Sequence, residues 1–186
     1  LQLLFLALVL DHVETFCAYL RGEAPRPKPL RLLLLGTAGT GKTHVSKTML
    51  QTLQRKLAKA GLSSKFVRVA APTGCAAFNV RFNATTVHRL IHWFNLRVFA
   101  ELDNPDYLSA LQKHLDLTEL IALDEISMVG RQMMGRIDSR CQQAKLALGI
   151  LAATPSEVFL SCASAIPHKS KQSETSRCTT WTAPRY

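Results

Sequence analysis

The sequence contains no C-x-x-C pair, and its cysteine count of five is odd. A disulfide framework needs paired cysteines and a zinc site needs closely spaced ones, so we expect neither. A reducing compartment fits this pattern best. The cysteines are Cys17, Cys75, Cys141, Cys162 and Cys178.

The apolar run that opens the chain, residues 1–10, is too short for a membrane span. Residues 1–10 are apolar, but no basic region precedes them and Asp11 follows. A spanning helix needs about 20 apolar residues, and a signal sequence begins with basic ones. We interpret the segment as the buried face of a first helix over residues 3–20 and expect no membrane partner. Since the chain does not begin with Met, we expect its natural N-terminus to lie upstream.

Acidic residues are few, 13 against 23 basic ones, which gives a formal net charge of +10. Such an excess favours a polyanionic partner, although many basic proteins bind none. A solvated helix face is the alternative explanation for the basic side chains that cluster over residues 55–68. Charge alone therefore leaves nucleic-acid binding open.

Residues 36–43 read Gly-Thr-Ala-Gly-Thr-Gly-Lys-Thr, a complete G-x-x-x-x-G-K-[ST] phosphate-binding loop. Its glycines let consecutive backbone N–H groups turn toward a phosphate. In such a loop the lysine reaches the β- and γ-phosphates and the final hydroxyl ligates Mg²⁺. We predict that ATP and Mg²⁺ are the cofactors, with Thr43 on the metal. The predicted nucleotide-binding residues are Gly36, Thr37, Ala38, Gly39, Thr40, Gly41, Lys42 and Thr43.

Apolar runs alternate with helical patterns on both sides of this loop. The predicted strands cover residues 31–35, 66–71 and 117–123, and the predicted helices cover residues 3–20, 43–60, 85–94 and 106–115, with a further helix from Thr73. Such alternation predicts one α/β domain with a parallel sheet and helices on both faces. Ligands gather at the carboxyl ends of parallel strands, where the phosphate loop, residues 72–74 and residues 124–125 fall.

Asp124 and Glu125 end the third predicted strand. Nucleotide hydrolysis needs a carboxylate near the metal and a group that activates water. We assign Asp124 to the metal through water and Glu125 to the attacking water as general base. The alternative is an acidic pair that caps a helix.

The segment after the second predicted strand begins a helix at Thr73 with free backbone N–H groups. Such a terminus binds a phosphate of a nucleic-acid strand or of a nucleotide. Thr86 and His88 add a hydroxyl and an imidazole nearby. The alternative is that Thr73 is only an N-cap and His88 only a surface histidine.

Four segments carry a resemblance to a known family. They are residues 36–43, Ala-Pro-Thr-Gly-Cys-Ala-Ala-Phe-Asn at 71–79, Thr-Thr-Val-His-Arg-Leu at 85–90 and Leu-Asp-Glu-Ile-Ser-Met-Val at 123–129. In order and spacing they resemble successive motifs of the PIF-type (petite integration frequency) superfamily-one DNA helicases, including helicase segments of Helitron transposons. The resemblance implies an incomplete RecA-like P-loop NTPase domain, the first of two motor domains.

This resemblance also implies a function and site residues. Family members use ATP to move 5′ to 3′ along single-stranded DNA in repair, recombination and telomere maintenance. By motif position, Thr73, Gly74, Thr86 and His88 would contact the DNA backbone, and Gln2 would read the adenine. The implied address is intracellular, in the nucleus, with the mitochondrion as the alternative.

The resemblance ends near residue 145. Family members continue with Pro-Phe-Gly-Gly, a strand and a Gly-Asp-x-x-Gln segment, which this chain lacks. We therefore divide the chain into a helicase domain, residues 1–145, and a non-homologous tail, residues 146–186, which we expect to be largely disordered, most of all over residues 161–186. A gene-model error, an intron read-through and a decayed transposon copy are the alternative origins of this change.

Two other functions stay open. One is a non-catalytic, nucleotide-dependent DNA-binding fragment or a decayed helicase remnant. The other is a P-loop kinase of small molecules, which has no support beyond the phosphate loop itself. We expect ATP and Mg²⁺ to bind but no unwinding by this chain alone, and the sequence leaves the oligomeric state open.

Overall fold

A computed structural model describes the chain except for residues 1, 38–39, 95–97, 147–157, 166–177 and 181–186. The described helices are α1 (Gln2–Leu20), α2 (Lys42–Lys59), α3 (Gly74–Val80), α4 (Val87–Leu90), α5 (Pro105–Leu115) and α6 (Arg131–Leu146). The described strands are β1 (Leu32–Thr37), β2 (Val67–Ala71), β3 (Thr85–Thr86), β4 (Leu120–Asp124), β5 (Val158–Ala165) and β6 (Cys178–Thr180). Two 3₁₀ turns, η1 (Ser64–Phe66) and η2 (Ile126–Met128), complete the order.

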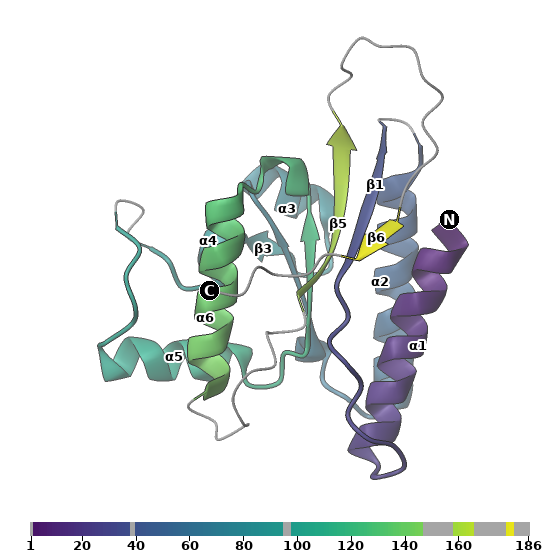
Figure 1. Cartoon of the computed structure of the whole chain (residues 1–186), viewed down its shortest axis with the longest axis horizontal. Helices are drawn as coiled ribbons and strands as arrows, with labels where there is room; N and C mark the ends of the chain where they lie inside the picture. The colour runs from purple at the N-terminus through teal and green to yellow at the C-terminus, as the bar shows by residue number, and fades with distance from the viewer. Residues whose placement is uncertain (1, 38–39, 95–97, 147–157, 166–177, 181–186) are drawn as a thin grey trace.

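The described strands form a single sheet in the order β3-β2-β4-β5-β1-β6 (Figure 1). The strands from β3 to β1 are parallel, and β6 pairs antiparallel with β1 as the outermost strand on that side. The carboxyl ends of the parallel strands therefore meet along one edge of the sheet. This edge carries the ends of β1, β2, β3 and β4, where the predicted site residues other than Gln2 lie.

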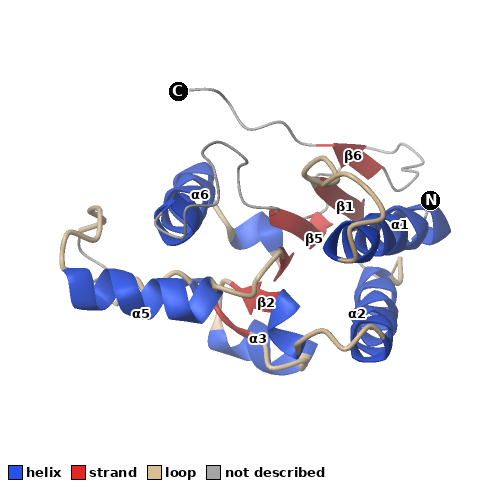
Figure 2. Ribbon diagram, turned by 90° about the horizontal axis from the view of Figure 1, so that it is seen from below, coloured by secondary structure: helices blue, strands red, loops and turns tan. Residues whose placement is uncertain are grey.

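Helices cover both faces of the sheet, with α1 and α2 on one side and α5 and α6 on the other (Figure 2). Along β4, Leu120 and Ala122 face the first set, and Ile121 and Leu123 face the second. A strand buried on both faces reads as a continuous apolar run, which is why β4 was predictable. The parallel sheet with helices on both faces is confirmed.

Helix α1 has two different apolar surfaces. Phe5, Val9 and Val13 are at most 1% exposed and lie in the core that α1 shares with α2 and β1, whereas Leu3 is 80% exposed. Residues Leu3–Leu20 are long and apolar enough to cross a membrane by length and composition, although residues 1–10 alone are not. Core helices of soluble proteins and N-terminal signal sequences both have this composition. The first helix is confirmed, and the expected lack of a membrane partner stays a prediction.

Residues 85–94 form less helix than the sequence predicts. Thr85 and Thr86 make β3 beside β2, and α4 ends at Leu90. His92 has a left-handed backbone (φ 50°), and the Trp93 N–H donates to the His88 carbonyl at 2.9 Å. This reversal ends the helix and buries Trp93. The free energy gained by burying this large ring exceeds the helix propensity of the segment, whose apolar residues have helical spacing.

Strand β5 includes residues 161–165 and corrects the expectation of disorder there, whereas residues 166–177 and 181–186 of the predicted disordered segment lie outside the described residues. It lies between β4 and β1, where Leu123 pairs with Ser161 and Leu34 with Cys162, and β6 adds a second paired segment. The small and polar residues of β5 gave little strand signal, since their pairing depends on partners distant in sequence. The division of the chain at residue 145 stays a prediction.

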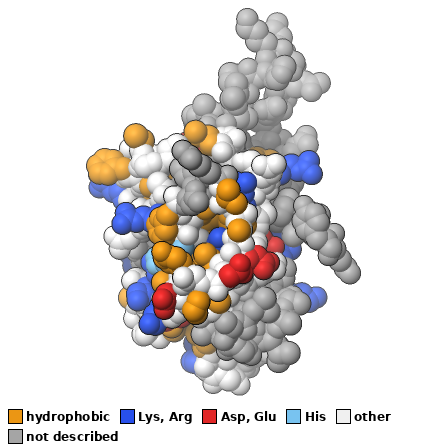
Figure 3. Space-filling view, turned by 90° about the vertical axis from the view of Figure 1, so that its left-hand side faces the viewer, with side chains coloured by type: hydrophobic (Ala, Val, Ile, Leu, Met, Phe, Trp, Pro, Cys, Tyr) orange, Lys and Arg blue, Asp and Glu red, His pale blue; other side chains and the backbone are white. Residues whose placement is uncertain are grey.

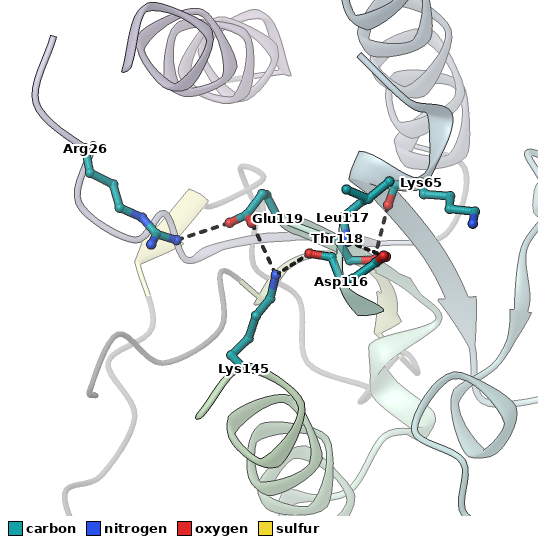
Figure 4. A network of polar contacts seen from close by, with 7 residues as sticks. All are labelled: Arg26, Lys65, Asp116, Leu117, Thr118, Glu119 and Lys145. Atoms are coloured by element: carbon teal, nitrogen blue, oxygen red, sulfur yellow. Dashed lines mark hydrogen bonds and ion pairs between the residues drawn. The ribbon is translucent and has the colours of Figure 1, made fainter. Parts of the chain in front are cut away.

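A polar network fixes the opposite edge of the sheet, at the start of β4 (Figure 4). The Glu119 carboxylate accepts from Arg26 Nη2 at 3.1 Å and from Lys145 Nζ at 3.2 Å. Lys145 Nζ also donates to the Asp116 carbonyl at 3.2 Å. One half-buried carboxylate thus joins the loop after α1, the start of β4 and the last turn of α6.

Candidate nucleotide and nucleic-acid site

The predicted phosphate loop connects β1 to α2, as the motif requires. Gly36 and Thr37 are the last residues of β1, Lys42 is the first residue of α2, and Ala38 and Gly39 lie outside the described residues. Gly41 precedes α2 with a left-handed backbone (φ 79°) and no side-chain cap. Residues with a Cβ avoid this conformation, which accounts for glycine here. The N-terminus of α2 therefore offers its backbone N–H groups and its positive dipole end to an anion.

Lys42 and Thr43 take different positions at this helix start. Lys42 is only 8% exposed, and its Nζ donates to Thr40 Oγ1 at 3.5 Å. The exposed Thr43 lines a cavity of about 20 Å³ together with Asp124 at the end of β4. The structure thus brings the two predicted metal ligands to one cavity. A hydroxyl and a carboxylate are oxygen donors, which fit Mg²⁺.

Burial raises the pKa of the Asp124 carboxyl. The negative charge of Glu125 raises this pKa further, while a hydrogen bond from the Glu125 backbone and the charge of Lys47 act in the opposite direction. Asp124 is half-buried, and the ionised form of such a carboxyl is stabilised when a cation binds beside it. This electrostatic environment is a second observation that fits Mg²⁺.

Glu125 turns the chain directly from β4 into η2. It has a left-handed backbone (φ 53°, ψ 44°), and its carbonyl accepts from the Met128 N–H at 3.0 Å. A non-glycine residue in this region costs on the order of 1–3 kcal/mol, and such residues cluster at functional sites. The half-buried Glu125 thus lies directly after the predicted metal ligand.

The predicted DNA contacts lie at the same edge of the sheet. Thr73 Oγ1 accepts from the Ala76 N–H at 3.2 Å and caps α3, and Thr86 Oγ1 accepts from the Arg89 N–H at 3.4 Å and caps α4. The register of β2 and β3 places Thr86 opposite Ala71. Both threonines are N-caps, which agrees with the alternative interpretation, and their contact with DNA stays a prediction.

The two remaining predicted site residues are Gly74 and Gln2. Gly74 is exposed at the start of α3, and a Cβ added to it would meet nothing within 4 Å. Gln2 is the first residue of α1, and its predicted adenine contact stays a prediction.

A family model described as an AAA domain matches residues 28–151. The chain belongs to the AAA domain family. This match covers β1, the phosphate loop and the Asp124-Glu125 pair, and it extends past residue 145. Membership implies nucleotide binding by a RecA-like P-loop domain.

Solved structures with the same fold include Pif1 helicases. The Candida albicans enzyme gives a TM-score of 0.58 at 20% identity, over 87% of this chain and 31% of that one. A Bacteroides Pif1 in complex with ADP-AlF3 and single-stranded DNA gives 0.51 at 22%, over 77% and 32%. A double mutant of Bacteroides Pif1 gives 0.52 at 27%, over 77% and 31%.

A curated relative is the RecBCD enzyme subunit RecD of Mycolicibacterium smegmatis. It is 30% identical over 128 residues, which are 56% of this chain and 21% of that protein. This AAA domain therefore spans about a third of the length of the Pif1 structures and about a fifth of RecD.

Sequence reasoning missed three residues of this AAA domain near the predicted DNA contacts. Phe78 on α3 is 84% exposed and lies one helical turn from Gly74. The Trp93 ring contacts the His88 ring in a tilted arrangement with centroids 5.1 Å apart, and the Arg136 guanidinium of α6 lies 4.4 Å from the centroid of the Trp93 ring. The place of Phe78 within the motif at residues 71–79 was a signal for it. The contacts of Trp93, in contrast, depend on the unpredicted reversal after α4.

A pair of histidines lies beside Arg68 on the α5 side of the AAA domain. The rings of His92 and His114 are 4.9 Å apart, and Arg68 Nη2 donates to the His114 carbonyl at 2.7 Å. Burial, together with the positive charges of Arg68, His92 and Lys65, lowers the pKa of His114 to about 4. Figure 3 shows histidine side chains on this side of the molecule among apolar and basic ones.

We expect His114 to make the domain acid-sensitive. The folded state keeps His114 neutral down to about pH 4, whereas the unfolded chain protonates it near its ordinary pKa of 6.5. Unfolding therefore takes up a proton between these values, and the free energy of unfolding falls as the pH drops from 6.5 to 4. In urea titrations, H114Q should lose less stability over this range than the parent, while H44Q, at an exposed position on α2, should follow the parent. Equal losses in H114Q and the parent would contradict the assignment.

Proposed function

We propose that this AAA domain is the first motor domain of an ATP-dependent 5′ to 3′ DNA helicase. The observation that supports this best is the shared cavity of Thr43 and Asp124, which joins the phosphate loop to the acidic motif. β4, which ends in Asp124, lies beside β2, which leads into Thr73. A nucleotide site and a candidate strand-binding site are thus neighbours on one edge of the sheet.

The proposed hydrolysis assigns one role to each residue. Lys42 and the backbone of the loop would bind the β- and γ-phosphates, and Thr43 and, through water, Asp124 would hold Mg²⁺. The metal would supply positive charge against the charge that develops on the phosphate oxygens. Glu125 accepts a proton from the attacking water. Buried apolar residues along one side of the cavity, Met49 and Leu50 among them, limit water access there.

We expect K42A to bind Mg·ATP more weakly than the parent. The substitution removes a charge-assisted contact to phosphate of about 1.5–3 kcal/mol, or roughly 10- to 150-fold in Kd. Calorimetry or a fluorescent ATP analogue measures this change. K59A removes an exposed lysine from the last turn of the same helix and should bind like the parent. Equal affinity in K42A and the parent would exclude the phosphate role of Lys42.

For single-stranded DNA we propose a path over Thr73, Gly74, Thr86 and His88. The Bacteroides Pif1 structure with ADP-AlF3 and single-stranded DNA has the same fold, which supports a DNA path on this domain. Phe78 adds an exposed aromatic ring on the face of α3 that carries Gly74. Bases stack on such rings without sequence preference.

F78A should therefore weaken binding of single-stranded DNA. Loss of one stacked base costs about 1–3 kcal/mol. Fluorescence anisotropy with labelled oligo(dT) measures the affinity, and log K should fall with log[salt] at a slope of about −0.7 per phosphate contacted. Y107A, which removes a 62% exposed ring from α5, is the matched control. A flat salt response, or equal losses in both variants, would contradict this DNA path.

ATP turnover with and without single-stranded DNA distinguishes the motor domain from a non-catalytic DNA-binding fragment. Turnover that rises with added DNA supports the motor, and binding of both ligands without turnover supports the fragment. We also propose an intracellular role in DNA repair, recombination or telomere maintenance, in the nucleus or mitochondrion. Localisation of the tagged protein in its own cells tests this last proposal.

A further inference from the structure

We propose that Trp93 and Arg136 are positioning residues that hold His88 in place for single-stranded DNA and fasten it to α6. This proposal rests on the proposed function, because it assumes that His88 contacts the strand. It adds two residues that lie outside the motifs of the predicted DNA site. Their role follows from a set of contacts between the end of α4 and one face of α6.

The first contact joins Trp93 to His88 in two ways. The ring centroids are 5.1 Å apart, and the two rings are tilted by 30° against each other. The Trp93 N–H also donates to the His88 carbonyl at 2.9 Å. Trp93 is 6% exposed whereas His88 is half-buried, so a fixed ring supports an imidazole that solvent and a ligand can reach.

The second set of contacts fixes Trp93 itself. Its Nε1 donates to the Val98 carbonyl at 3.1 Å, and the Phe99 ring packs edge-on with centroids 5.7 Å apart. The Arg136 guanidinium lies 4.4 Å from the Trp93 ring centroid and 5.4 Å from that of Phe99. A cation close to an indole face is attracted by the ring quadrupole, so Arg136 restrains the indole.

The third step is the position of Arg136 in the fold. Its neighbour Ile137 is fully buried in the same core cluster as Trp93 and Leu123, which fixes α6 against β4. Helix α6 begins shortly after η2, which follows Glu125 directly. Arg136 thus lies on the helix that follows the two predicted catalytic carboxylates in the sequence.

The test uses the full chain with W181F, so that Trp93 is the single tryptophan. Oligo(dT) binding is followed by anisotropy and by Trp93 emission, and a fluorescent ATP analogue reports the nucleotide site. We expect W93L and R136Q to weaken oligo(dT) binding by roughly threefold to tenfold without changing the affinity for the ATP analogue. W93F, which keeps a flat ring, should retain most of the affinity. K145Q is the control on the same helix, since Lys145 bonds at the opposite edge of the sheet.

Four outcomes decide the matter. Losses confined to DNA binding in W93L and R136Q, with recovery in W93F, support the proposal. Parental DNA affinity in both variants, while H88A is weakened, overturns it and leaves the proposed function intact. Parental affinity in H88A overturns it together with the DNA contact at His88. If circular dichroism shows that W93L and R136Q do not fold, the emission of Trp93 in the W181F protein decides. A change in emission with the same midpoint as oligo(dT) binding measured by anisotropy supports the proposal. Emission that stays constant as oligo(dT) is added overturns it.

Discussion

A chain that ends at residue 157 is expected to lose cooperative unfolding, because it lacks the strand that joins β4 to β1. β5 pairs with both neighbours, through Leu123 and Ser161 on one side and Leu34 and Cys162 on the other. Its removal leaves two strand edges without partners and divides the sheet into two parts. A domain of this size is stable by about 5–15 kcal/mol, so the loss of an internal strand exceeds what it tolerates. Thermal melts by circular dichroism and urea titrations measure the effect.

A second truncation separates β5 from β6. A chain that ends at Ala165 keeps β5 and should retain a cooperative transition at a lower Tm, since it lacks only the short antiparallel edge strand and the residues around it. The two truncations together show whether the sheet needs its internal strand. A chain of residues 1–157 that melts like the parent would contradict this expectation and support the predicted boundary near residue 145.

For E125Q we expect ATP turnover to fall by about 10²–10⁴-fold while Mg·ATP still binds. The amide accepts a hydrogen bond from the attacking water but cannot accept its proton. The backbone at Glu125 is left-handed and accepts the Met128 N–H, and glutamine has the same shape, so η2 should be retained. Phosphate release in the presence of single-stranded DNA and binding of the ATP analogue measure the two effects separately.

A matched control keeps the change of charge but moves it away from the site. E23Q alters an exposed carboxylate that pairs with Arg21 on the surface, and turnover should match the parent. Full activity in E125Q would remove the general-base role and leave Asp124 as the remaining candidate in the acidic pair. Equal losses in E125Q and E23Q would point to a general effect of charge.

Local sequence patterns predicted β1, β2, β4 and the phosphate loop, because one physical requirement fixes the composition or the spacing of each. β1, β2 and β4 are short apolar runs, and burial on both faces of a sheet requires that composition. The phosphate loop was predictable because its spacing is tied to one backbone geometry, which includes the left-handed Gly41. The meeting of Thr43 and Asp124 at one cavity followed from strand order alone.

Other parts depend on contacts that local patterns do not encode. β5 pairs with strands far away in sequence, and its Ser-Cys-Ala-Ser-Ala half has little strand propensity of its own. The reversal at His92 depends on a place for the Trp93 ring against Phe99 and Arg136. The support of His88 could not be predicted for the same reason.

The position of β5 also affects how the protein is made. The strand comes late in the sequence yet lies inside the sheet. While the chain emerges from the ribosome, β1 and β4 therefore lack the strand that pairs with both of them. Strands that are distant in sequence pair slowly during folding, and strands with unpaired edges associate with other chains. Synthesis should therefore depend on chaperones until residue 165 has left the exit tunnel, and co-expression of a chaperone that holds nascent chains should raise the soluble yield.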